Sequence, residues 1–167
     1  MGGFDMLRFS GIPGITDAFT TLAAAGTIVT QNLFETESQT HLLRIYADAK
    51  GDSQIEELAI ATKPTPEGWA REAQRVPVTG VIVRETSPKR DFHWHTVSVP
   101  SFAITIVGEI EVEVSGGARR RVRAGDIVFL EDTKGKGHIT RQKVHVTNLF
   151  INVPDGFDVV AWSRGKA

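Results

Sequence analysis

From residue 41 onward, short apolar segments alternate with clusters of turn-forming residues. The segments at 42–46 and 55–61 flank the turn formers of residues 48–52, an arrangement that predicts a hairpin. Strand-like patterns recur at residues 76–84, 102–107, 109–114, 127–130, 144–153 and 157–162. Pro66 after a capping Thr65 predicts instead a short helical turn over residues 66–73. Strands at this spacing, without alternating helices, predict an all-β sandwich or barrel.

Charged residues mark a second hairpin at residues 109–123. Glutamates alternate with apolar residues in 109–114, a glycine-containing turn follows, and residues 119–123 are rich in arginine. Opposite charges that face each other across an antiparallel pair stabilise it. We therefore expect the arginines to pair with Glu109, Glu111 and Glu113 on an exposed strand, in preference to attracting an anionic substrate.

The first 38 residues carry a different pattern, rich in glycine near their start. Thr16 or Asp17 can cap a short helix that Gly26 ends. One helix cannot form a helix-turn-helix, so a DNA-binding module is disfavoured. We expect residues 1–38 to be an extension, either a flap over the barrel or a contact to a second subunit, and residues 39–167 to form a single barrel domain.

Composition narrows the chemistry. The 167 residues, 41% of them apolar, suffice for one domain with a buried core, and the net charge of -1 gives no electrostatic case for nucleic acid or an anionic membrane. The absence of cysteine excludes disulfides, thiolate nucleophiles and sulfur ligation of a metal. No apolar run approaches the ~20 residues of a membrane helix, and no secretion signal is recognisable, so a cytoplasmic protein is expected.

Histidines are the candidate functional residues. In an extended strand His93 and His95 share one face, and His138 follows a glycine-rich loop. Neutral imidazoles are good ligands for transition metals. The same residues could instead be hydrogen-bonded to their neighbours in a polar pocket.

These spacings resemble the two sequence motifs of the cupin superfamily. The first motif has His-x-His, a Glu a few residues later and a Gly that closes the next turn. His93, His95 and Gly108 match it, whereas Ser101 stands at the position of the Glu, which is the usual carboxylate ligand.

The second cupin motif runs Gly, five residues, Pro-x-Gly, two residues, His, three residues and Asn. Gly125 matches its start, Gly135 and His138 keep the Gly-x-x-His spacing, and Gln142 stands in place of the Asn. Glu131 replaces the Pro, and the loop before His138 is two residues longer. The run from Gly125 to Arg141 also resembles that of a group of small single-domain bacterial cupins.

The resemblance implies a double-stranded β-helix, a cupin jelly-roll barrel with an interior pocket, preceded here by a short N-terminal helical extension. It also implies a homodimer. In the metal-dependent case His93, His95 and His138 would bind Fe, Mn, Ni or Zn, with open positions for Ser101, water or a substrate oxygen. Gln142 would then orient the substrate for dioxygenase-, isomerase- or lyase-type chemistry, and Ser101 would lie in the substrate pocket.

The alternative function is a non-catalytic, metal-free cupin that binds a small molecule through hydrogen bonds from the histidines. Ser101 in place of the Glu would then mean that the metal has been lost. Three acids near the motif strands, Asp91, Glu131 and Asp132, are candidates for a general base or for a partner behind a ligand. We expect them instead to be solvated turn residues, as most carboxylates are.

Overall fold

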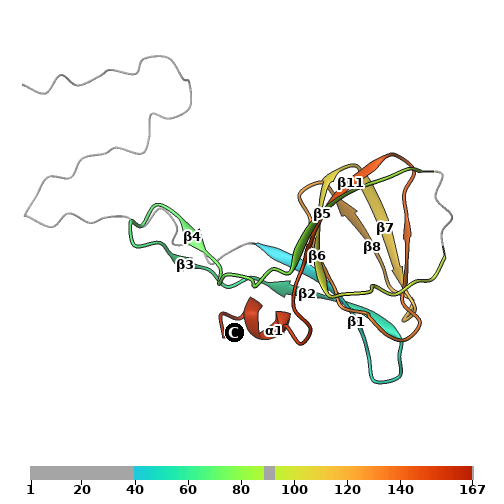
Figure 1. The fold of residues 1–167 in the computed structure, drawn as a ribbon, viewed down its shortest axis with the longest axis horizontal. Helices are drawn as coiled ribbons and strands as arrows, with labels where there is room; N and C mark the ends of the chain where they lie inside the picture. Colours follow the sequence, from blue (N-terminus) through green and yellow to red (C-terminus); the bar gives the residue numbers. More distant parts are fainter. Residues whose placement is uncertain (1–39, 89–92, 167) are drawn as a thin grey trace, which may run out of the picture. The chain divides into compact units, whose positions relative to one another are not determined.

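The computed structural model describes residues 40–88 and 93–166, and these residues form an all-β fold of two facing sheets with one short helix (Figure 1). The elements are β1 (His41–Ala47), β2 (Ser53–Ala59), β3 (Lys63–Pro64), β4 (Arg71–Glu72), β5 (Gly80–Thr86), β6 (Ser101–Val107), β7 (Glu109–Val114), β8 (Arg119–Arg123), β9 (Ile127–Leu130), β10 (His138–Arg141), β11 (Val146–Asn152) and α1 (Val159–Ser163). No helix among the described residues is long and apolar enough to span a membrane.

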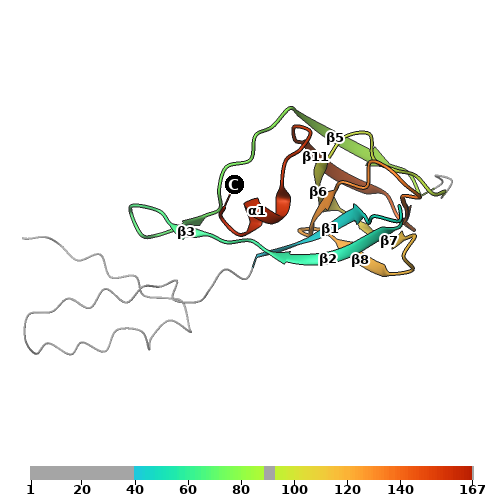
Figure 2. The ribbon, with the colours of Figure 1, turned by 90° about the horizontal axis from the view of Figure 1, so that it is seen from below.

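The larger sheet has six strands in the order β2-β1-β9-β6-β11-β5, and the smaller sheet has three in the order β10-β7-β8. Strands β1 and β9 run parallel, and the other named pairs in these two sheets run antiparallel. The two views place β7 and β8 across the barrel from β5 (Figures 1 and 2). The predicted all-β jelly-roll barrel is therefore confirmed, whereas its N-terminal helical extension lies outside the described residues.

Two apolar cores explain why the central strands read as continuous hydrophobic runs. Inward residues of both sheets form one core inside the barrel, among them Ala103, Val112 and Val128. The alternate residues Phe102 and Phe129 point to the other side of the larger sheet, where α1 covers them. Because successive side chains of a strand face opposite ways, β6 and β9 are apolar on both faces.

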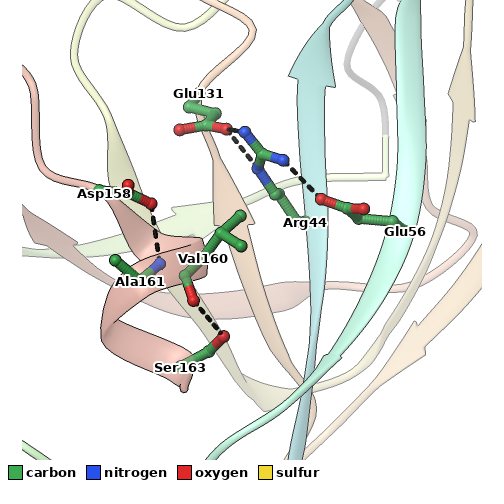
Figure 3. A network of polar contacts seen from close by, with 7 residues as sticks. All are labelled: Arg44, Glu56, Glu131, Asp158, Val160, Ala161 and Ser163. Carbon is green, nitrogen blue, oxygen red and sulfur yellow. Dashed lines mark hydrogen bonds and ion pairs between the residues drawn. The ribbon is translucent and has the colours of Figure 1, made fainter. Parts of the chain in front are cut away.

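The strand predicted at residues 157–162 is wrong, because the chain forms α1 from Val159 to Ser163 instead. The carboxylate of Asp158 accepts a hydrogen bond from the Ala161 N–H at 2.9 Å and caps the first turn (Figure 3). Val159 and Trp162, three residues apart, lie on one helical face and pack in the core that contains Phe102 and Phe129. The indole N–H of Trp162 donates to the Gln74 carbonyl oxygen at 2.8 Å, which satisfies the one polar atom of that side chain.

The helical turn predicted over residues 66–73 is also wrong. Strands β3 and β4 pair there as a small hairpin, in which the Thr65 N–H donates to the Ala70 carbonyl oxygen at 2.9 Å. Gly68 has a φ of 77°, a conformation that ends a helical path and turns the chain back. The proline therefore starts a turn and not a helix.

Both predicted hairpins are confirmed. Strands β1 and β2 pair in register from His41↔Ala59 to Ala47↔Ser53. In the second hairpin Glu109, Glu111 and Glu113 face arginines of β8, as the charge pattern predicted. Arg141 of β10 also pairs with Glu113, so this carboxylate links all three strands of the smaller sheet.

We expect Glu113→Gln to destabilise the protein only where the carboxylate is ionised. The hydrogen bond from Arg141, with Arg119 nearby, holds the pKa of Glu113 below its ordinary value of 4.5. A depressed folded-state pKa contributes stability above 4.5, and that stability is lost as the pH falls through the folded value.

Thermal unfolding of wild type and Glu113→Gln should therefore show a lower melting temperature for the variant at neutral pH and convergence in acid. Glu57→Gln, on the exposed face of β2, is the control and should change little at either pH. An equal loss for Glu113→Gln at both pH values would contradict the ion-pair explanation.

Candidate functional site

A cavity of ≈ 250 Å³ lies between the two sheets. Its walls are built from alternate residues of the strands, because every second side chain of each strand points into the barrel. The larger sheet contributes Ser101, Ala103 and Thr105 of β6 and Val146, Asn148, Phe150 and Asn152 of β11. The smaller sheet contributes Ile110 and Val112 of β7 and His138 and Thr140 of β10.

His138, at the start of β10, is a buried polar residue of the cavity wall, and its ring has a buried hydrogen-bond partner. It is 3% exposed, and its Nδ1 lies 2.7 Å from the Oδ2 oxygen of Asp132, which is 0% exposed. The Ser53 hydroxyl donates to the same oxygen at 3.1 Å. Because Nδ1 is occupied by the carboxylate, Nε2 is the nitrogen that His138 offers to the cavity.

Asp132 corrects one expectation. It was predicted to be a solvated turn residue, yet it is fully buried behind His138. A buried carboxylate is costly unless it is hydrogen-bonded, and His138 and Ser53 supply bonds to Oδ2, whereas Oδ1 has no partner among the described residues. Ser53 begins β2, 79 residues before Asp132 in the chain, so no local pattern could have shown this contact.

His95 lies beside His138. Their backbones exchange two hydrogen bonds, from His95 N–H to the His138 carbonyl oxygen at 3.0 Å and in the reverse direction at 2.9 Å. Their ring centroids are 4.5 Å apart, and both residues line the cavity. The structure therefore brings together two of the three predicted metal ligands.

Gly137 makes this close approach possible. Its φ is 74°, and a Cβ built on it would lie 2.1 Å from the carbonyl oxygen of His95. Only glycine combines that conformation with that proximity. The sequence analysis selected Gly135 by its motif spacing and missed Gly137, although a glycine directly before the histidine was the available signal.

His93 lies apart from this pair. It is exposed, its ring centroid is 5.7 Å from that of His95, and it is not among the residues that line the cavity. Its carbonyl oxygen lies 3.0 Å from Nδ1 of His95. Within residues 40–88 and 93–166, no group of three or more His, Cys, Asp or Glu side chains is arranged to hold a metal ion. The ligand set His93, His95 and His138 thus stays a prediction.

Ser101 and Gln142, the other predicted site residues, both line the cavity. The Ser101 hydroxyl donates to Oδ1 of Asn152 at 2.8 Å. The Gln142 amide donates to the Ser87 carbonyl oxygen at 3.1 Å, which ties the end of β10 to the end of β5. Their roles in binding or orienting a substrate stay predictions.

The two remaining acids lie elsewhere. Glu131 pairs with Arg44, which also binds Glu56, in a network on the larger sheet (Figure 3). Burial raises the pKa of Glu131, and the charge and hydrogen bond of Arg44 oppose that rise. Glu131 therefore has a structural partner on β1 and is absent from the cavity wall, whereas Asp91 lies outside the described residues.

Sequence analysis missed two features of the cavity. The hydroxyl of Thr105 donates to Oδ1 of Asn148 at 3.0 Å, a pair on adjacent strands of the larger sheet. The guanidinium carbon of Arg84, on β5, lies 4.4 Å from the centroid of the Phe150 ring. In a strand every second side chain points to the same face. This alternation in residues 80–86 and 146–152 could have predicted that these side chains face the cavity.

No protein-family model and no curated protein matches this chain. Among solved structures it is similar to a protein of Neisseria meningitidis at 14% identity and a TM-score of 0.38, over 52% of this chain and 90% of that one. A protein of Salmonella typhimurium assigned to ethanolamine utilization gives 14% identity and a TM-score of 0.36, over 71% and 98%. An RmlC-like cupin of Desulfovibrio desulfuricans gives 14% identity and a TM-score of 0.30, over 77% and 98%.

We expect Gly137→Ala to destabilise the protein far more than Gly117→Ala. Both glycines have positive φ, at 74° and 92°, but a Cβ at Gly117 would meet nothing within 4 Å. Gly117→Ala should cost ~1 to 2 kcal/mol from backbone conformation alone, whereas Gly137→Ala must also displace His95. Urea unfolding measures both free energies, and equal losses would show that the His95 contact does not constrain the loop.

Proposed function

We propose that the cavity between the sheets binds a small organic molecule, with His138 as its polar anchor. The observation that carries this proposal is the pairing of His138 with the fully buried Asp132 at the wall of a 250 Å³ cavity. Small-molecule sites are typically concave and largely apolar, with a few well-placed polar groups. The mixed walls of this barrel have that character.

The size of the cavity limits the ligand. A cavity of ≈ 250 Å³ lies just below the ~300 to 1,000 Å³ that is typical of small-molecule sites. A single ring or a short chain with one polar group fits this size.

Asp132 explains what His138 can do for such a ligand. By accepting from Nδ1 it fixes the orientation of the ring, so that in a neutral imidazole Nε2 is presented as an acceptor. Nε2 can then take a hydrogen bond, or a proton, from a bound molecule. The same geometry therefore serves a binding protein and a metal-free enzyme that moves a proton.

A metal-dependent enzyme is the second candidate. Two imidazoles 4.5 Å apart, one of them supported by a carboxylate, are an arrangement that metal sites also use. His93 would have to complete the set for Fe, Mn, Ni or Zn. Because the described residues bring only His95 and His138 to the cavity, the set is incomplete as it stands, and we derive no chemical step through a metal.

Filling the cavity should abolish binding. We expect at least one of four probes, benzoate, benzamide, cyclohexanecarboxylate and cyclohexanecarboxamide, to bind the wild-type protein in ligand-observed NMR. Thr140→Phe places a ring in the cavity and should remove that binding. Thr147→Phe, on an outward position of β11, is the matched control and should preserve it.

His138→Gln should weaken the binding of the two amide probes about tenfold, because the buried hydrogen bond that Nε2 accepts from the amide N–H is lost. A wild-type protein that binds none of the four probes contradicts the proposed function. Equal binding by wild type and Thr140→Phe also contradicts it, because the ligand would then lie outside the cavity.

Elemental analysis of the untagged protein tests the metal-dependent candidate. That candidate predicts close to one equivalent of transition metal in wild type and none in the double variant His95→Ala/His138→Ala. His145→Ala, which removes an exposed histidine outside the cavity, should retain the metal. A wild-type protein that is isolated without metal and fails to take up Fe, Mn, Ni or Zn on titration rules this candidate out.

A further inference from the structure

We infer that the molecule bound in the cavity is a small organic acid whose carboxylate pairs with Arg84. The inference rests on the proposed function, since it names the class of ligand for the same cavity. Arg84 belongs to β5, the edge strand of the larger sheet, and faces Asn148 of β11 in register. Its side chain lines the cavity.

The Arg84 guanidinium is held in place without using its hydrogen bonds. It stacks on Phe150, with 4.4 Å between the guanidinium carbon and the ring centroid. Stacking uses the face of the guanidinium and leaves its in-plane N–H groups directed sideways, where they can bind a carboxylate with two parallel hydrogen bonds. The group is thus oriented before a ligand arrives, which reduces the entropy lost on binding.

Apart from the stacking contact with Phe150, Arg84 has no charged partner among the described residues. Within residues 40–88 and 93–166, no ion pair or hydrogen bond engages its side chain. Arg44, Arg119 and Arg141, by contrast, each pair with a glutamate. Arg84 is an exposed residue of β5 that lines the cavity and has no carboxylate partner among the described residues, so a bound ligand can supply the negative charge.

The charges around the cavity also favour an anionic ligand. Its described lining residues include Arg84, His95 and His138 and no aspartate or glutamate. Asp132 lies behind His138, on the Nδ1 side of the ring. A cavity wall that carries the Arg84 guanidinium and no carboxylate among its described residues favours an anion, although water partly screens the exposed guanidinium.

The apolar residues of the cavity wall indicate that the rest of the ligand is apolar. Ala103, Val112, Val128 and Leu130 give the cavity an apolar surface contributed by both sheets. A carboxylate attached to an apolar ring or chain fits both the single guanidinium and these walls.

The test compares each acid with its neutral amide in the full-length protein by isothermal titration calorimetry. We expect benzoate and cyclohexanecarboxylate to bind the wild-type protein about tenfold to a hundredfold more tightly than benzamide and cyclohexanecarboxamide, as a charge-assisted hydrogen-bonded pair allows. Arg84→Gln should remove that preference, and Arg84→Lys should keep part of it because the charge remains without the planar fork. Arg120→Gln, on β8 outside the cavity wall, should leave the preference unchanged.

The outcomes separate this inference from the proposed function. If acids and amides bind with equal affinity and Thr140→Phe abolishes both, the cavity is a ligand site and the carboxylate inference is wrong. If the acids are preferred but Arg84→Gln keeps the full preference, Arg84 is not their partner and the inference is also overturned. If neither acids nor amides bind the wild-type protein, both the inference and the proposed function fail.

Discussion

The buried hydrogen bond between Asp132 and His138 is the interaction on which the rest of the site depends. A fully buried carboxylate is costly unless donors reach it, and here two donors from distant parts of the chain reach its Oδ2 oxygen. His138 belongs to the smaller sheet and Ser53 to the larger one, so Asp132 joins the two sheets at one end of the barrel. The pair fixes a polar group of the cavity and helps to close the barrel around it.

The loop before β10 is shaped by the same constraint. Gly137 lets the backbone pass close enough to His95 for the two-way backbone bridge to form. That bridge brings the segment that carries His95 beside β10 and places two imidazoles at the cavity wall. Opposite them the larger sheet supplies neutral polar pairs, such as Thr105 with Asn148, and the stacked Arg84. The cavity therefore combines a fixed imidazole, an oriented cation and apolar surface.

The sequence predicts those features that depend on neighbouring residues. The hairpin of β7 and β8 follows from glutamates and arginines that alternate within a short stretch, and both the register and the pairing agree with it. The segment that forms α1 was misassigned because a run of six apolar-rich residues fits a strand or a helix equally well. Only the cap by Asp158 and the packing of Trp162 decide it.

Contacts between distant residues could not be predicted. The motif spacing located His95 and His138 at the cavity, but it could not show that His93 lies outside the wall or that Asp132 folds inward to meet Ser53. Arg84 was missed because its partner, Phe150, lies on another strand far along the chain.

The tautomer of His138 tests the central claim most directly. Long-range ¹H–¹⁵N correlation NMR on protein labelled at histidine distinguishes a proton on Nδ1 from one on Nε2. If Asp132 orients this ring, neutral His138 carries its proton on Nδ1 and leaves Nε2 bare toward the cavity. A proton found on Nε2 would mean that Asp132 does not accept from the ring, and the account of His138 as the anchor of the ligand would be wrong.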